Sequence, residues 1–282
     1  MTVPIHNILL LQLYNFRGRI EKKGLMLNIT VFIKQVPDTD DVQWTAENNI
    51  DRKNTDSILN PLDRQALSAA LKLKEASGAE IAAVSMGPDK ALDVLKEAIA
   101  MGADDAALLS DSKFTGSDTC ATSKVLAASI KEIFKNTDLI LFGQSASDGE
   151  TSQTGAQTAV RLGLPYITNV TEIIGIENGF VTAYSETETE KILYKVKLPA
   201  ALCINNYVYK ASLPDISGYI RAKDYNYKTY NIFELKLSPE ETGIKGSPTY
   251  VSKVYRTDET RCCKMIDTNE ALKIIKEAVY GS

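Results

Sequence analysis

Residues 143–155 read GQSASDGETSQTG and combine small residues with acidic and hydroxyl side chains. The apolar run Leu139–Phe142 before them predicts a buried strand, and the pattern from Gln153 to Val160 predicts a helix. The first N–H groups of a helix have no partners and attract anions, and small residues let a ligand approach the backbone. The segment therefore indicates a phosphate-binding loop. An ordinary strand-to-helix turn remains open, because a glycine-rich loop alone is a weak motif.

The chain has few histidine and cysteine side chains that could take part in catalysis or metal binding. The single histidine is His6, in a segment that differs in character from the rest of the chain. If that segment lies outside the fold, Ser-His and Cys-His nucleophile pairs and histidine-ligated metal sites are excluded. The four cysteines form no CxxC pair, so neither a zinc site nor a disulfide framework is indicated. We expect a bound cofactor to supply any chemistry.

The composition of the chain excludes further classes of protein function. The chain has 282 residues, 44% of them hydrophobic, which is enough to bury a full core. Its net charge of −4 and the lack of a strongly basic block argue against nucleic-acid binding. No apolar run is long enough to cross a membrane, so we expect no membrane span and a cytoplasmic location.

From Met26 onward, apolar runs alternate with helical patterns. Strands are expected at 28–36, 81–86, 106–109 and 139–142, and a helix is expected to begin at Asn60-Pro61 and to end at Gly78. This alternation predicts an α/β fold with a doubly wound, mostly parallel sheet of the Rossmann-like nucleotide-binding kind. Ligands in such folds lie beyond the carboxyl ends of the strands. The four segments expected there are 34–39, 85–88, 111–119 and 143–155.

The character of the chain changes after Pro165. Strands at 166–174 and 180–184 flank Glu177-Asn178-Gly179, which predicts a hairpin, and 191–204 predicts one further strand in an antiparallel region. Residues 207–230 show no clear period and are expected to form an extended arm, and 268–280 predict a terminal amphipathic helix.

These patterns divide the chain into three segments. Residues 1–25 form an N-terminal extension, residues 26–206 the nucleotide-binding α/β domain with its hairpin, and residues 207–282 a loop and C-terminal arm with the terminal helix. The break in pattern at Met26 predicts that the first segment is dispensable; the alternative is a docking arm.

Six motifs in order resemble the beta subunits of electron transfer flavoproteins. They are VFIKQVPDT at 31–39, NPLD at 60–63, VSMGP at 84–88, AMGAD at 100–104, GSDT at 116–119 and DGETSQTG at 148–155. The resemblance extends from Met26 to the C-terminus. It implies pairing with a larger alpha subunit that holds an FAD, and electron exchange with an acyl-CoA dehydrogenase or a related flavoenzyme.

The resemblance also implies a nucleotide in the beta subunit. The implied cofactor-binding residues are Lys34, Val36, Asp38, Asn60, Asp63, Ser85, Met86, Gly87, Gly116, Asp118, Thr119, Gly143, Gln144, Asp148, Gly149, Thr151, Gln153, Thr154 and Gly155. Many family members hold structural AMP there. Electron-bifurcating members hold a second FAD, which takes electrons from NADH and divides them between a high-potential and a low-potential acceptor such as ferredoxin or flavodoxin.

Residues 149–153 favour FAD over AMP. AMP-type members tend to carry an extra acidic residue where Gly149 stands and an asparagine where Ser152 stands, whereas bifurcating members resemble the GETSQ found here. Gly149 and Ser152 leave room for a pyrophosphate, to which Thr151 can donate. Glu150 replaces the usual aspartate and Thr154 matches the AMP type, so AMP remains an alternative.

The family also has a partner-docking loop. Its ends resemble Lys210–Pro214 and Arg221–Lys223, which implies docking by Leu213, Pro214, Arg221 and Lys223, with Leu213 as the anchor. A different class of function remains open as well, because small ATP-sensing domains without redox chemistry share this fold class. A partner alpha subunit and a bound flavin would distinguish the two classes.

Overall fold

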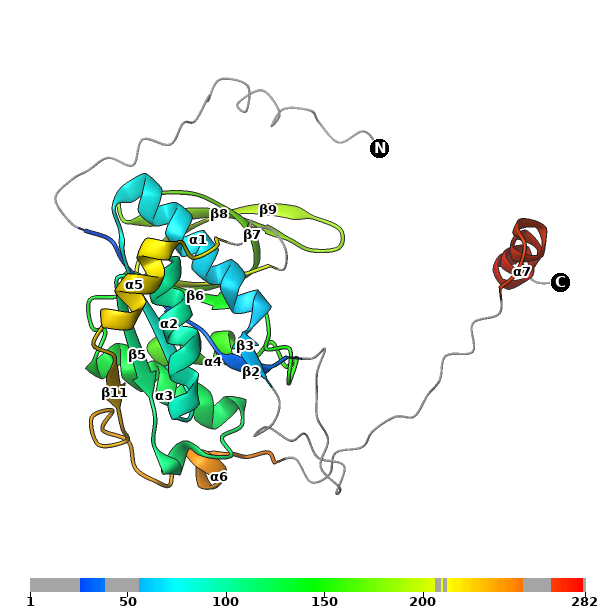
Figure 1. Ribbon diagram of the computed structural model, residues 1–282. Helices are drawn as coiled ribbons and strands as arrows, with labels where there is room; N and C mark the ends of the chain where they lie inside the picture. Colours follow the sequence, from blue (N-terminus) through cyan, green and yellow to red (C-terminus); the bar gives the residue numbers. More distant parts are fainter. Residues whose placement is uncertain (1–25, 39–55, 206–208, 210–211, 251–264, 281–282) are drawn as a thin grey trace.

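The computed structural model describes residues 26–38, 56–205, 209, 212–250 and 265–280 (Figure 1). The predicted extension 1–25 lies outside the described residues, as do Lys210, Cys262 and Cys263. Cys120 and Cys203 are free thiols.

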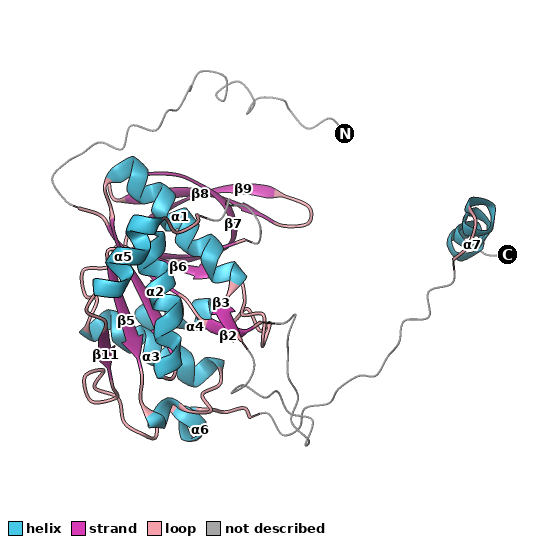
Figure 2. Cartoon of the chain, in the orientation of Figure 1, coloured by secondary structure: helices cyan, strands magenta, loops and turns pink. Residues whose placement is uncertain are grey.

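A long, mostly parallel sheet crosses the molecule, with helices on both faces (Figure 2). Within the described residues it has nine strands in the order β11-β5-β4-β1-β6-β10-β7-β8-β9. In that order the strands are β11 (Lys228–Tyr230), β5 (Asp105–Leu109), β4 (Glu80–Met86), β1 (Asn28–Phe32), β6 (Leu139–Gly143), β10 (Ala200–Ile204), β7 (Tyr166–Glu177), β8 (Phe180–Glu186) and β9 (Lys191–Lys197). The strands from β11 to β7 are parallel, and β8 and β9 are antiparallel. The predicted fold class is confirmed.

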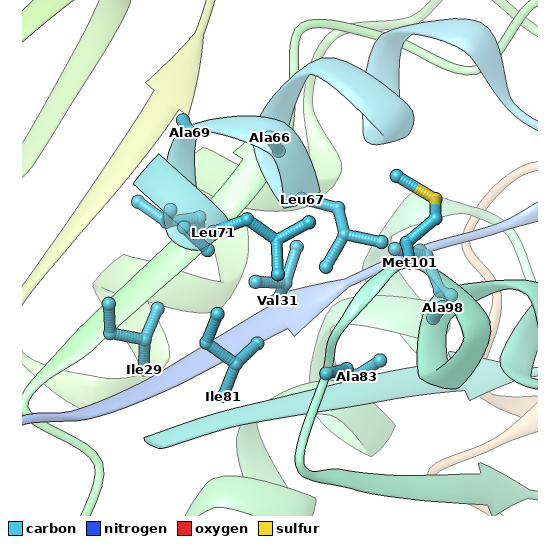
Figure 3. Packing of buried hydrophobic residues seen from close by; sticks show 14 of the residues in the cluster. Ile29, Val31, Ala66, Leu67, Ala69, Leu71, Ile81, Ala83, Ala98 and Met101 are labelled. Carbon is cyan, nitrogen blue, oxygen red and sulfur yellow. The ribbon is translucent and has the colours of Figure 1, made fainter. Parts of the chain in front are cut away.

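The two faces of the sheet bury separate apolar clusters because alternate residues of a strand point to opposite faces. Ile29 and Val31 of β1 pack in the cluster beneath the first two long helices, α1 (Pro61–Ser77) and α2 (Leu92–Met101) (Figure 3). Phe32 packs in the other cluster, which includes Val125 of α3 (Thr119–Glu132) and Ala159 of α4 (Thr154–Leu162). Burial on both faces is what a doubly wound fold requires.

Several element boundaries match the sequence pattern. Helix α1 follows Asn60, contains Pro61 in its first turn and ends at Gly78, whose φ of 74° is left-handed. The hairpin between β7 and β8 turns at Asn178 and Gly179, both with positive φ. The terminal helix α7 (Thr268–Tyr280) is confirmed.

Two expected single strands are each divided in the structure. The run 28–36 forms β1 and, after Ile33 and Lys34, β2 (Gln35–Pro37), which pairs with β3 (Ser57–Leu59) instead of extending the central sheet. The run 191–204 forms β9 and β10, separated near Pro199, which has no N–H for a sheet ladder. Strand β10 then lies between β6 and β7, parallel to both, so the expectation of an antiparallel region was wrong for this strand.

The expected extended arm at 207–230 was also wrong where the structure describes it. Residues Ile216–Asp224 form helix α5, which lies against α2, and β11 adds an edge strand beside β5. Only two residues of α5, Gly218 and Ala222, are buried. The buried pattern in the sequence is therefore too short to reveal a helical period. A short helix, α6 (Gly243–Gly246), follows.

Candidate functional site

The site is located at the point where strand order reverses. From β1 the chain continues to β4 and β5 on one side, and then crosses to β6 on the other side of β1. The loops after β1 and β6 therefore diverge to opposite faces, which is where open α/β sheets bind ligands. Lys34 and Gln144 lie directly beyond these two strand ends.

An ion pair spans this point. The ammonium group of Lys34 lies 2.6 Å from one carboxylate oxygen of Asp148 and 2.9 Å from the other. The Lys34 side chain remains 47% exposed and that of Asp148 15% exposed. Two predicted site residues that are distant in sequence are thus brought into contact, with the cation accessible to an incoming anion.

Asp63 lies beneath the ion pair, in the first turn of α1. Its carboxylate accepts the backbone N–H of Lys34 at 2.8 Å. A Cβ atom on Gly143 would lie 2.4 Å from the other carboxylate oxygen and 2.5 Å from the carbonyl carbon of Leu62. Only glycine permits this close approach between the end of β6 and α1.

Burial raises the pKa of Asp63 to about 7. The hydrogen bonds from the Asn60 side chain and from the backbone of Lys34 act in the opposite direction, as does the positive charge of Lys34. The carboxyl group therefore changes its charge close to neutral pH, at a position shared by three elements of the site.

Asn60 holds the loop that follows β6. Its position before α1 is that of an N-cap, but its side chain makes no capping hydrogen bond. Instead its amide nitrogen donates to the carbonyl of Ser145 at 2.8 Å, and its amide oxygen accepts the N–H of Ser147 at 3.3 Å. The sequence predicted the residue but not this role, because the partners are 85 and 87 positions away.

The loop from Ala146 to Gln153 turns tightly and leaves open space beside Gly149. The carbonyl of Ala146 accepts the N–H groups of Gly149 and Glu150, and Glu150 and Ser152 adopt positive φ values of 46° and 53°. No atom lies within 4 Å of the position a Cβ on Gly149 would take. Thr151, two residues further along the loop, is exposed. The residues present therefore fit a group that approaches the loop from solvent.

The start of α4 closes the other side of the loop. Gln153 occupies the N-cap position without a side-chain capping bond, so the first N–H groups of α4, including those of Thr154 and Gly155, are available to an anion. A Cβ on Gly155 would lie 2.9 Å from the hydroxyl of Tyr166, which requires glycine for close packing. Thr119 at the start of α3 donates to the side chain of Gln153 at 3.2 Å.

The other predicted residues lie around this centre. Val36 is buried in β2, Asp38 is half-buried after it, and Met86 and Gly87 are half-buried at the end of β4. The hydroxyl of Ser85 is buried and has no hydrogen-bond partner within the described part of the chain.

Gly116 and Asp118 belong instead to a junction with the C-terminal segment. A Cβ on Gly116, whose φ is 77°, would lie 2.5 Å from the side chain of Ile244. Asp118 accepts the N–H of Ala121 through one oxygen and the N–H and hydroxyl of Thr249 through the other. Asp118 therefore caps α3 and anchors the segment after α6.

Sequence reasoning missed residues on β7 and β10 that support the loop. Gln144 donates to the side chain of Asn169, in β7, at 3.4 Å, and Cys203 in β10 has its sulfur 3.7 Å from the carbonyl oxygen of Gly143. No local signal marked them, because their importance comes from the insertion of β10 beside β6.

The predicted docking residues lie at α5, on a different part of the surface. Leu213 is 79% exposed, and with Ile216, Tyr219 and Ile220 it forms an exposed apolar group that we call the α5 patch. Lys223 is exposed and Pro214 is half-buried. Arg221 donates to the carbonyl of Ile99 at the end of α2, so its guanidinium group is partly engaged within the chain.

A surface cavity of about 410 Å³ lies elsewhere, between α3 and the segment after β11, with Lys124, Arg161 and Lys236 in its wall. It contains none of the predicted nucleotide residues. Among the described residues there is no cluster of three metal-ligating side chains, and no described helix is long and apolar enough to span a membrane.

Comparison with known proteins agrees with this geometry. The family of the electron transfer flavoprotein domain matches residues 48–219. The electron transfer flavoprotein subunit beta of Megasphaera elsdenii is 39% identical over 236 residues, which cover 81% of this chain and 87% of the relative. Subunit CarD of the caffeyl-CoA reductase-Etf complex of Acetobacterium woodii is 39% identical over 231 residues, with the same coverage of 81% and 87%. The acryloyl-CoA reductase electron transfer subunit gamma of Anaerotignum propionicum is 33% identical over 257 residues, covering 88% and 95%. The chain therefore belongs to the electron transfer flavoprotein family and is similar over most of its length to the beta subunits of that family.

Proposed function

We propose that the site between β1 and β6 holds FAD and that the chain works as the beta subunit of an electron-bifurcating electron transfer flavoprotein. The observation that carries this proposal is the open space at Gly149, next to the uncapped start of α4. A pyrophosphate needs both room beside the backbone and unpaired N–H groups.

The chain's own residues would bind and orient the cofactor. The first N–H groups of α4 and the hydroxyl of Thr151 would donate to the pyrophosphate, and the ammonium group of Lys34 would balance its charge. Asn60 would keep the loop in place through its bonds to Ser145 and Ser147. When bound, FAD supplies the capacity to accept hydride and to pass on single electrons.

The proposed partners are an alpha subunit that carries its own FAD, a dehydrogenase-type flavoenzyme and a low-potential acceptor. NADH would be the transient electron donor. The names of the relatives from Acetobacterium woodii and Anaerotignum propionicum link them to CoA-thioester reductases, which supports an acyl-CoA dehydrogenase or a related flavoenzyme as partner. Ferredoxin or flavodoxin would be the low-potential acceptor.

Counting the cofactors released by denaturing the purified heterodimer tests the proposal. Two FAD and no AMP per heterodimer are expected. One FAD with one AMP would overturn the bifurcation proposal and support the alternative, a beta subunit with structural AMP, which Thr154 favours. Release of ATP without flavin would point to a non-redox sensor, against which the family match already argues.

A further inference from the structure

We propose that Asp63 positions the nucleotide loops by joining the ends of β1, β6 and α1, and that its carboxyl group takes up a proton when the nucleotide binds. This inference rests on the proposed function, because it concerns how the same site responds to an anionic ligand. Asp63 itself is buried and bonded to protein groups, so it acts through the loops and not by touching the ligand.

The contacts of Asp63 connect the loop after β1, the end of β6 and the start of α1. The carboxylate holds the N–H of Lys34 after β1 at 2.8 Å. It also interacts with the side chain of Asn60 and the backbone of Gly143. Asn60 in turn fixes Ser145 and Ser147, and Lys34 fixes Asp148. A change at Asp63 is therefore transmitted to both loops between which the pyrophosphate is proposed to lie.

Charged and titratable groups surround Asp63 on its own helix and on the neighbouring elements. Lys34, after β1, carries the positive charge, and it is paired with Asp148 of the loop after β6. Cys203 of β10 interacts with the charge of Asp63, and Tyr166 of β7 contacts Cys203. Burial raises the pKa of both the Cys203 thiol and the Tyr166 hydroxyl, so both stay neutral at physiological pH. On α1 itself, Arg64 is paired with Glu97 of α2.

This arrangement fixes the direction of the coupling. Ionised Asp63 and Asp148 with one Lys34 leave the centre with a net negative charge. A pyrophosphate brings further negative charge, which disfavours ionised Asp63 and raises the pKa of its carboxyl group above its value of about 7 in the free protein. Between the two pKa values the bound state holds more protons than the free state. Binding then takes up protons, and affinity falls as the pH rises through that window.

Calorimetric titration of FAD into the heterodimer, after removal of the beta-site nucleotide, measures the effect directly. At pH 7.5 the titration is carried out in two buffers that differ in their heat of ionisation. The pyrophosphate of FAD stays fully ionised in this range, so a buffer-dependent heat reports protons bound by the protein. We expect uptake of up to about one proton per FAD, decreasing toward pH 6, where Asp63 is already protonated.

Two variants separate Asp63 from other groups. Asp63→Asn keeps the shape and an acceptor oxygen but cannot bind the proton, so the uptake should vanish and the affinity should depend less on pH. Asp89→Asn removes an exposed carboxylate after β4 and should leave the uptake unchanged.

The outcomes distinguish this inference from the proposed function. FAD binding without proton uptake by the wild-type protein overturns the role of Asp63 and leaves the FAD site standing, as does uptake that persists in Asp63→Asn. If FAD does not bind, the FAD proposal fails. In that case the same titrations are carried out with AMP in place of FAD. Equal proton uptake by the wild type and Asp63→Asn would overturn the inference. Greater proton uptake by the wild type would support it.

Discussion

The ammonium group of Lys34 lies 2.6 Å from the carboxylate of Asp148, across the point where the strand order reverses. The two residues are 114 positions apart, and their contact joins the loop after β1 to the loop after β6. Such a partly exposed pair contributes at most about 1 kcal/mol to stability. Its importance lies in position, because an anion that enters the loop meets a lysine already held at its entrance.

Gly149 tests whether the loop space belongs to the ligand. Gly149→Ala should fold and retain beta-site flavin, because an added Cβ meets no atom within 4 Å. Gly149→Asp should fold equally well but bind the flavin at least about tenfold more weakly, since its charge would lie near the pyrophosphate. Flavin content and dissociation constants of both variants provide the measurement. An equal loss in both would show that the backbone freedom of glycine is what matters.

Gly143 should be intolerant of any side chain. In Gly143→Ala the Cβ would lie 2.4 Å from an Asp63 oxygen and 2.6 Å from the Asp63 nitrogen, so α1 or β6 must shift. We expect a loss of about 1–3 kcal/mol or more in the free energy of unfolding, measured with denaturant. Gly175→Ala is the matched control, because its Cβ would meet nothing within 4 Å. Equal stability of the two variants would contradict the close approach.

The buried carboxyl group of Asp63 should make stability depend on pH. Its pKa is raised from an ordinary value of 3.8 to about 7, so between these values the folded state holds a proton that the unfolded state has lost. Stability from this group is therefore present at low pH and is lost as the pH rises through about 7.

Asp63→Asn lacks this dependence. From pH 4 to pH 8 its free energy of unfolding should rise relative to the wild type by on the order of 4 kcal/mol. Denaturant unfolding at several pH values measures the difference. A constant difference between the two proteins would show that Asp63 is ionised throughout.

Leu213 tests the docking prediction. Leu213→Ala should slow electron exchange with the partner dehydrogenase by more than about tenfold, because truncating an interface anchor costs at least about 2 kcal/mol of binding. NADH oxidation with an artificial dye should be nearly unchanged, since the α5 patch and the nucleotide loops are separate. Leu193→Ala, on the exposed strand β9, makes the same chemical change elsewhere and should affect neither activity. Parallel loss of both activities in Leu213→Ala would identify a folding residue instead.

The α/β class and the family could both be predicted from local patterns of residues. Asn60-Pro61 and Gly78 marked the two ends of α1, because proline fits the first turn of a helix and the left-handed backbone at Gly78 ends the helix locally. The motifs also identified Lys34, Asn60, Asp63 and Asp148 as members of one site. Helix-ending residues and residue types are local features, so the positions of elements and the motifs can be read directly from the sequence.

How those residues act together depends on contacts between segments that are distant in the sequence. The five buried residues of β10 read as part of a longer strand, and nothing local specifies that they insert between β6 and β7. The side chain of Asn60 fits a capping role from the sequence, yet it binds a loop more than 80 residues away. The raised pKa of Asp63 likewise arises from burial of its carboxyl group in the folded chain, and the hydrogen bonds from Asn60, Lys34 and Gly143 only partly offset this effect. Strand partners, burial and side-chain contacts depend on which distant segments meet in space, and a local pattern of residues does not encode that.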